Sequence, residues 1–133
     1  MIPARLQKKC SLLVALAMAT LTSVAYAGAL YPTPVSIITA GGNTSVSGAV
    51  DTARYSTDAY QDIGCATGGD GYISCWANDS NNNYASCYSY NLGAGATASV
   101  AGINAASLIR FGYSDSTGQC SSVYVGNSSS YLH

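Results

Sequence analysis

The sequence predicts a small, mainly β domain, all-β or α+β, that is stabilised by two disulfide bonds. We expect an antiparallel sheet or sandwich of five or six strands with one short helix. Three observations favour this class. Apolar and polar residues alternate with a period of two along most of the chain, turn-forming residues separate the alternating stretches, and four cysteines follow residue 27.

Residues 1–27 have the features of a cleaved secretory signal peptide. Arg5, Lys8 and Lys9 precede an apolar run over residues 11–25, and Ala25-Tyr26-Ala27 fits a small-x-small cleavage site. The run is shorter than the roughly 20 apolar residues that a membrane span needs. We therefore expect a single domain over residues 28–133, secreted or periplasmic, that does not insert into a membrane.

The cysteine count supports the same compartment. Cleavage would remove Cys10 and leave an even number of cysteines in an oxidising environment, where two disulfides are the natural state. Zinc is disfavoured, because no Cys-x-x-Cys pair exists and the one histidine is the last residue. The four cysteines are Cys65, Cys75, Cys87 and Cys120.

The composition beyond residue 27 predicts a small core and excludes several partners. That segment holds only six Ile, six Val and four Leu, so cross-links are expected to compensate for the limited apolar interior. Arg54 and Arg110 stand against six Asp, with no Lys and no Glu. A basic nucleic-acid footprint and a polybasic membrane-surface patch are therefore both excluded.

The first half of the domain predicts three strands. Val35–Ala40 is apolar and β-branched and follows Pro32 and Pro34, which suits an edge strand within the domain or one that pairs with a neighbouring subunit. The turn Gly41-Gly42-Asn43 leads to an alternating strand over Thr44–Val50. A further strand ends at Cys65, before the glycine-rich turn at residues 68–71.

A β-hairpin is the best-defined unit of the sequence. Strands over Tyr72–Ala77 and Tyr84–Tyr90 flank a polar loop of turn-forming residues, 78–83. If Tyr72 lies opposite Tyr90, then Cys75 lies opposite Cys87. Of the three connectivities that four cysteines allow, this register favours Cys75–Cys87 and Cys65–Cys120, provided that the facing pair is a close one.

The last third predicts a helix followed by a second hairpin. Val100 and Ile103 fall at helical spacing within a segment rich in Ala and Gly, so we expect a short helix over residues 97–106. Residues 108–113 and 120–125 alternate as strands around the turn at residues 115–118. In the first of these strands Ile109, Phe111 and Tyr113 share one face.

Aromatic residues of the central hairpin are the candidate binding surface. In the register above they all point to one face of the sheet, opposite the cysteines: Tyr72, Trp76, Tyr84, Tyr88 and Tyr90. Either this face is itself the core, or the cysteine face is the core. In the second case the aromatic residues form an amphipathic surface without charge, suited to stacking on sugar rings or docking to a protein.

Catalytic and metal-binding patterns are weak. Asp58 with Asp62, or Asp70 with Asp79, are the candidate carboxylate pairs of a hydrolase, but most of these residues lie in turn sequences. No phosphate-binding glycine motif is present, and no cofactor is expected. A weak calcium candidate uses Asp70, Asp79, Asn81 and Asn83, but a solvated hairpin loop is the favoured explanation of these residues.

These patterns together predict a non-enzymatic binding or structural module of the cell surface or periplasm, of the adhesive or filament-forming kind. Its expected partner is a protein or a glycan, and self-association is compatible with the sequence. One alternative is a small secreted effector, such as a protease inhibitor or a toxin. The turn-formers in the 78–83 loop disfavour inhibition, because inhibitory loops usually carry a specificity residue. A carboxylate-dependent hydrolase is the further alternative.

Overall fold

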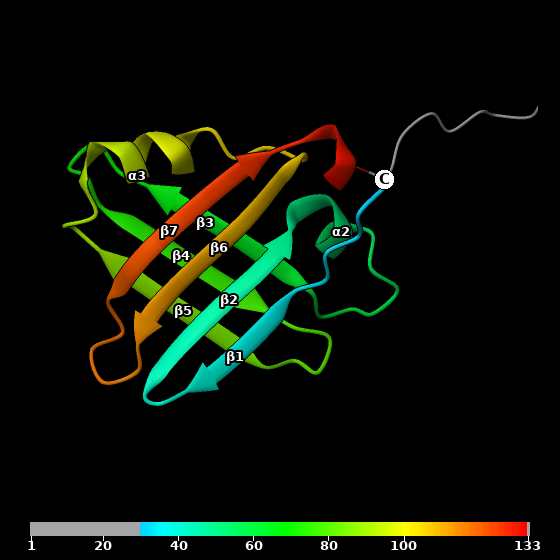
Figure 1. The fold of residues 1–133 in the computed structure, drawn as a ribbon, viewed down its shortest axis with the longest axis horizontal. Coiled ribbons are helices and arrows are strands. Elements are labelled where there is room, and N and C mark those ends of the chain that lie inside the picture. Colours follow the sequence, from blue (N-terminus) through cyan, green and yellow to red (C-terminus); the bar gives the residue numbers. More distant parts are fainter. Residues whose placement is uncertain (1–29, 133) are drawn as a thin grey trace, which may run out of the picture.

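The computed structural model describes residues 30–132, so the predicted signal peptide, Cys10 and His133 lie outside the described residues. The described part is mostly β, with two antiparallel sheets and two short α-helices (Figure 1). The helices are α2 (Val50–Arg54) and α3 (Gly93–Ala101), and a 3-10 turn, η1 (Ser129–Tyr131), follows the last strand. The strands are β1 (Ser36–Ala40), β2 (Asn43–Ala49), β3 (Asp62–Thr67), β4 (Ile73–Asn78), β5 (Tyr84–Ser89), β6 (Ser107–Ser114) and β7 (Cys120–Asn127).

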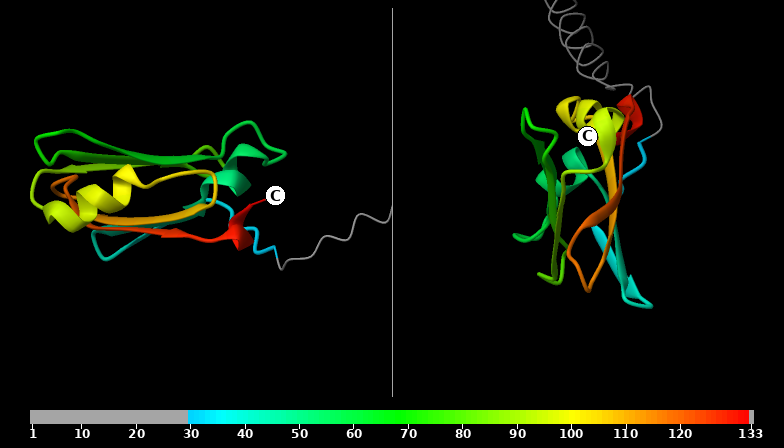
Figure 2. Two further views of the ribbon diagram at one scale, coloured as in Figure 1. Left: turned by 90° about the horizontal axis from the view of Figure 1, so that it is seen from above. Right: turned by 90° about the vertical axis from the view of Figure 1, so that its left-hand side faces the viewer.

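The two sheets form a sandwich. One has the strand order β1-β2-β6-β7 and the other β3-β4-β5. They lie face to face as two layers (Figure 2), and their strands cross in projection (Figure 1). An isolated bridge links Tyr88 on β5 to Gln119, the residue just before β7. α2 packs against β2, β3 and β6, and α3 packs against β3 and β7, so each helix connects the two layers.

The predicted total of five or six strands is wrong: residues 30–132 form seven strands, one for each of the stretches that the sequence predicts separately. The segment that ends near Cys65 is a complete strand, β3, paired along its whole length with β4. The predicted strand to Val50 also ends earlier, since Val50 begins α2, a helix that the sequence did not predict. Asp51 in its first turn and Arg54 in its last turn suit the two ends of the helix dipole.

The predicted helix exists but begins and ends earlier than expected, at Gly93–Ala101 instead of residues 97–106. Its end is fixed by Gly102, whose backbone N–H donates to the carbonyls of Ala98 and Ser99. Asn104 then forms a turn in which its side-chain oxygen accepts from the backbone N–H of Ala106. An asparagine that bonds to the backbone beyond itself competes with helix continuation.

The first hairpin follows the prediction closely. Gly41 and Gly42 both have positive φ, +58° and +75°, which is the signature of a type I′ turn. This two-residue turn places Ala40 opposite Asn43 and Ser36 opposite Ser47. β1 is the edge strand of its sheet, as Pro32 and Pro34 predicted.

The core lies between the inner faces of the two sheets. Ile109 and Phe111, which were predicted to share one face of β6, are both buried in this core. The three-stranded sheet contributes smaller residues that fill the same interior: Ile63, Ile73, Cys75, Ala77, Ala85 and Cys87. The interior is therefore built from few large side chains, and sulfur atoms occupy part of it.

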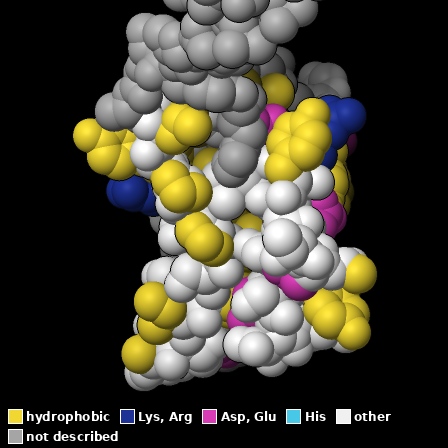
Figure 3. All heavy atoms as spheres, turned by 90° about the vertical axis from the view of Figure 1, so that its right-hand side faces the viewer, with side chains coloured by type: hydrophobic (Ala, Val, Ile, Leu, Met, Phe, Trp, Pro, Cys, Tyr) yellow, Lys and Arg dark blue, Asp and Glu magenta, His cyan; other side chains and the backbone are white. Residues whose placement is uncertain are grey.

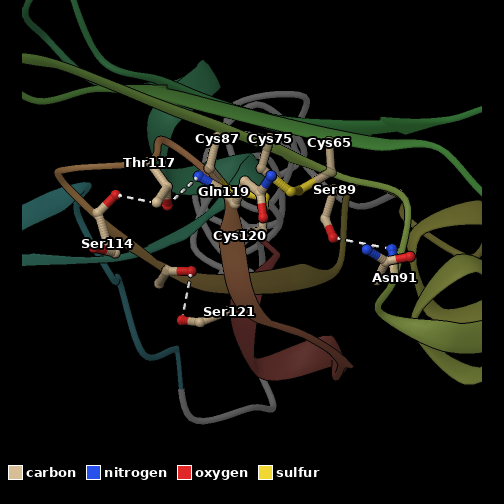
Figure 4. The surroundings of a disulfide bond; sticks show 11 residues. Cys65, Cys75, Cys87, Ser89, Asn91, Ser114, Thr117, Gln119, Cys120 and Ser121 are labelled. Carbon is tan, nitrogen blue, oxygen red and sulfur yellow. Dashed lines mark hydrogen bonds between the residues drawn. A yellow bond between two sulfur atoms is a disulfide. The ribbon is translucent and has the colours of Figure 1, made fainter.

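All four predicted cysteines form disulfides, but the predicted pairing is wrong. The bonds are Cys65–Cys75 and Cys87–Cys120. The register itself is confirmed, since Cys75 does lie opposite Cys87. However, β4 is the central strand, and Cys75 also lies opposite Cys65 on β3. Figure 4 shows Cys65, Cys75 and Cys87 side by side on the sheet, with Cys120 facing them.

Backbone geometry decides between the two neighbours of Cys75. Along antiparallel strands, close pairs alternate with wider, hydrogen-bonded pairs. A residue of the central strand therefore forms a close pair with one neighbouring strand and a wider pair with the other. The Cα atoms of Cys65 and Cys75 are 4.0 Å apart, as in a close pair. The N–H of Tyr88 donates to the carbonyl of Gly118, away from β4, so Tyr88 is not in a hydrogen-bonded pair with β4. The adjacent residue, Cys87, therefore forms the wider, hydrogen-bonded pair with Cys75. Cys87 is left to bond Cys120 across the sandwich.

Candidate functional site

The aromatic residues of the central hairpin lie on the outer face of the three-stranded sheet. Burial alternates along β4 and β5, and the cysteines and alanines point inward. Tyr84, Tyr88 and Tyr90 are 63%, 45% and 60% exposed, whereas Tyr72 and Trp76 are half-buried. We call this surface the aromatic face: Tyr72, Trp76, Tyr84, Tyr88 and Tyr90. The structure thus selects the exposed alternative of the two that the sequence left open.

Trp76 is held at the centre of this face by two residues of β3. Gly64 lies directly opposite Trp76, and a Cβ atom at Gly64 would come within 2.8 Å of the indole Cζ2 atom. The indole therefore covers the position where a side chain would otherwise stand. Its Nε1–H donates a 2.9 Å hydrogen bond to Oδ2 of Asp62. These two contacts fix the orientation of the ring before any partner binds.

Asp62 also corrects the expectation of a surface without charge, because its carboxylate lies next to Trp76. Neither Asp62 nor Gly64 was predicted as part of this surface. The missing signal was the pairing of β3 with β4. Had Cys65 been placed opposite Cys75, the same register would have placed Gly64 opposite Trp76 and Asp62 opposite Asn78.

A pair of aromatic rings lies at the end of the face near α3. The ring centroids of Tyr72 and Tyr90 are 5.0 Å apart and the ring planes are tilted by 50°. Tyr90 also lines a mainly apolar hollow of about 490 Å³ between the β3–β4 turn and α3. The other residues of this hollow are small: Gly68, Gly69, Gly71, Gly93, Ala94, Thr97, Ala98 and Ala101.

The calcium candidates are not brought together. Asp79 lies in the β4–β5 loop, where Oδ1 accepts from the backbone N–H groups of Asn81 and Asn83 and Oδ2 accepts from the Asn83 side chain. Asp70 lies in the β3–β4 turn and accepts from the backbone N–H of Tyr72. The two loops are at opposite ends of β4, on the order of 20 Å apart for six residues of strand. Within residues 30–132, no group of three or more His, Cys, Asp or Glu side chains could hold a metal ion.

The candidate hydrolase carboxylates are also used by local structure. Oδ1 of Asp58 accepts from the backbone N–H groups of Tyr60 and Gln61, and Oδ2 accepts from the Gln61 side chain. The Gln61 side-chain hydrogen bond is the main cause that lowers the pKa of Asp58, and the Asn83 side chain does the same for the pKa of Asp79. A general acid needs a raised pKa, so these shifts disfavour proton donation by either group.

The outer face of the four-stranded sheet carries a shallow groove of about 480 Å³. Its lining mixes serines with the exposed side chains of Ile38 and Tyr124, and the Arg110 guanidinium lies 6.0 Å from the centre of the Tyr124 ring. On the side of the molecule shown in Figure 3, hydrophobic side chains form several separate groups, with acidic side chains visible between them. The groove lies on the opposite side of the sandwich from the aromatic face.

Comparisons of the chain with protein-family models, with curated proteins and with solved structures find no match in any of the three. None of the helices within residues 30–132 has the length and apolar character needed to cross a membrane. The two disulfides are consistent with a secreted or extracellular protein. The function must therefore be argued from the surface itself.

Proposed function

We propose that this protein is a secreted or periplasmic binding module that recognises carbohydrate through its aromatic face. The observation that carries the proposal is the fixed indole of Trp76, which lies half-buried over Gly64 and is hydrogen-bonded to Asp62. A sugar ring presents an apolar C–H surface that stacks on an aromatic ring and hydroxyls that need hydrogen-bond partners.

The polar residues around Trp76 suit this ligand class. The Asp62 carboxylate accepts the indole N–H through one oxygen, and its second oxygen is available to accept from a sugar hydroxyl. Ser74 and Ser86 lie on the same face, beside Tyr88 and Trp76 respectively. Exposed tyrosines on both sides of Trp76 extend the platform along β5, and the hollow beside Tyr90 provides a shallow extension at one end.

The proposal is for binding without catalysis. Asp58 and Asp79 are the aspartates with a lowered pKa, and each already accepts several hydrogen bonds within its own loop. The face instead offers large aromatic area on a rigid sheet, which is the arrangement that binding surfaces use to limit the loss of conformational entropy. The secretory location rests on the predicted signal peptide together with the two disulfides.

The test is a fluorescence titration of Trp76, the one tryptophan of the chain, with a panel of neutral and acidic oligosaccharides. Binding should give a saturable change in emission with at least one glycan and should protect Trp76 from a soluble quencher. Tyr88→Ala should weaken that binding by about tenfold, because it removes one stacking ring next to Trp76.

Tyr124→Ala is the matched control, because Tyr124 is similarly exposed, at 56%, but lies on β7 in the other sheet. Its affinity should equal that of the unmodified protein. The proposal fails if no glycan gives a saturable change, or if Tyr88→Ala and Tyr124→Ala weaken binding equally. A saturable change with a surface protein but with no glycan would identify a protein-docking face instead.

A further inference from the structure

The geometry points to β1 as a self-pairing edge: we infer that two copies of this chain associate through antiparallel β1 strands, with Ile38 facing Ile38 across a two-fold axis. This inference is independent of the proposed carbohydrate site, because β1 belongs to the other sheet of the sandwich.

β1 is an open edge, against which neither α2 nor α3 packs closely. In contrast, β3 packs against both helices, β7 packs against α3, and an isolated bridge joins Tyr88 of β5 to Gln119, the residue before β7. Natural edge strands are commonly blocked by charges, bulges or prolines. β1 has the sequence Ser-Ile-Ile-Thr-Ala, with no charge and no proline, and its ladder with β2 is regular from Ser36 to Ala40.

The type I′ turn determines which backbone groups of β1 face outward. In such a two-residue hairpin the flanking residues, Ala40 and Asn43, are the hydrogen-bonded pair. Hydrogen-bonded pairs then recur at every second residue, at Ile38 and Ser36. The N–H and C=O groups of Ile37 and Thr39 therefore point away from β2, toward the open edge.

Two observations agree with this alternation of hydrogen-bonded and non-hydrogen-bonded pairs along β1. A Cβ atom at Gly48 would lie 3.1 Å from the Cα atom of Val35, as expected where the strands approach closely at a non-hydrogen-bonded position. The N–H of Val35 points away from β2 and donates to Oε1 of Gln61. Gln61 thus caps the edge at Val35. No group within residues 30–132 accepts from the N–H of Ile37 or Thr39.

The open part of β1 is complementary to itself. In an antiparallel pair centred on Ile38, Ile37 of one copy faces Thr39 of the other, and each such pair exchanges two backbone hydrogen bonds. Ile38 then occupies the close position between them, with Cα atoms about 4.5 Å apart. Its side chain is 63% exposed in the single chain and would pack against its symmetry mate. The product is a continuous sheet in which the two β1 strands are central.

Cross-linking tests this register directly. Ile38→Cys should form a disulfide-linked dimer under mild oxidation, because the two sulfur-bearing residues meet at the close position. Ser36→Cys is the matched control on the same strand and face. In this register the two copies of residue 36 are about 13 Å apart, four residues of strand, which is too far for a disulfide.

Sedimentation of the unmodified protein, with its two native disulfides formed, gives the second readout. It measures the fraction of dimer over about 1 µM to about 1 mM, the concentration range of transient affinities. We expect a dimer whose fraction rises with concentration, and we expect both Ile38→Lys and Thr39→Pro to abolish it. Ile38→Lys places two positive charges opposite each other across the two-fold axis, and Thr39→Pro removes a backbone N–H that donates to the second copy. Tyr124→Lys adds the same charge on β7 and should leave the dimer intact. Thermal melting of each variant confirms that the fold is retained.

The inference is overturned if the protein stays monomeric at about 1 mM. It is also overturned if the folded Ile38→Lys and Thr39→Pro variants still dimerise, or if Ser36→Cys cross-links as well as Ile38→Cys. Species larger than a dimer that keep growing with concentration would indicate an open, head-to-tail assembly and would exclude the two-fold pair.

Discussion

At the scale of single residues, Gly64 controls the orientation of Trp76. Gly64→Ala would place a methyl group 2.8 Å from the indole Cζ2 atom, so the ring must move away from β3. The ring lies on the outer face, where it has room to rotate, and we expect the free energy of unfolding to fall by less than about 1 kcal/mol. The hydrogen bond to Asp62 should be lost.

Two measurements distinguish the movement of the indole from a change in the stability of the fold. The emission maximum of Trp76 should shift to longer wavelength in Gly64→Ala, and glycan affinity should fall while the urea midpoint changes little. Ala66→Gly changes the same strand opposite Ser74 instead of Trp76 and serves as the control. Unchanged emission in Gly64→Ala would show that the indole is not held by the contact described above.

Asp79 makes the β4–β5 loop sensitive to acid. Hydrogen bonds from the Asn83 side chain, then from the backbone N–H groups of Asn83 and Asn81, hold the pKa of this carboxyl below its ordinary value of 3.8. A carboxyl with a lowered folded-state pKa contributes stability that is present above pH 3.8 and is lost as the pH falls through the folded-state pKa.

Asp79→Asn should therefore be less stable than the unmodified protein at pH 7, and the gap should close at the acid end. Urea unfolding of both proteins between about pH 7 and about pH 2 measures this difference. Asp58, whose pKa is also lowered, is present in both proteins and cancels in the comparison. A stability difference that is independent of pH would contradict the ionised role of Asp79.

At the scale of elements, two glycines near the start of α3 should respond oppositely to alanine. Gly93 has φ of +81°, which an alanine adopts only with strain, so Gly93→Ala should lower stability by about 1–2 kcal/mol. Gly95 lies inside the helix, and a Cβ atom added to it would meet no other atom within 4 Å outside the helix backbone. Gly95→Ala should raise stability by about 0.5–1 kcal/mol, measured by urea unfolding. A change in the free energy of unfolding in the same direction for both substitutions would contradict this account of the helix start.

The limits of sequence reasoning are visible in the same elements. Period-two alternation and turn residues determined the hairpins well, and the facing of Cys75 and Cys87 was predicted correctly because a buried face tolerates no register slip. α2 was missed because five residues carry too little periodicity to separate a helix from a strand end.

Lateral strand order was the information that the sequence did not contain. Alternation assigns a residue to a face but does not say which strand lies on its other side. Alternation identifies only Cys87 as a neighbour of Cys75, whereas Cys65 lies on its other side, and the predicted disulfide pairing is wrong for this reason. The same gap hid Asp62 and Gly64 from the candidate site, although the aromatic residues themselves were predicted to share a face.

At the scale of the whole molecule, one disulfide lies within a sheet and the other links the two sheets. Cys65–Cys75 joins adjacent strands of one sheet and closes a loop of 10 residues, whereas Cys87–Cys120 joins the two sheets and closes a loop of 33 residues. By loop-closure entropy, the first is worth about 3 kcal/mol and the second about 4 kcal/mol. The second also lies beside the Tyr88–Gln119 bridge, where the two layers meet.

Removing each bond as a pair of alanines should therefore have unequal effects. Cys87→Ala/Cys120→Ala should lose more stability in urea than Cys65→Ala/Cys75→Ala, and hydrogen exchange should become faster at the β5–β7 junction. Each double variant removes two sulfur atoms and serves as the packing control for the other, with Cys65 partly buried and the other three cysteines buried. If Cys65→Ala/Cys75→Ala is the less stable of the two, packing within the three-stranded sheet outweighs the covalent link between the layers. The sandwich would then not depend on its inter-sheet bond.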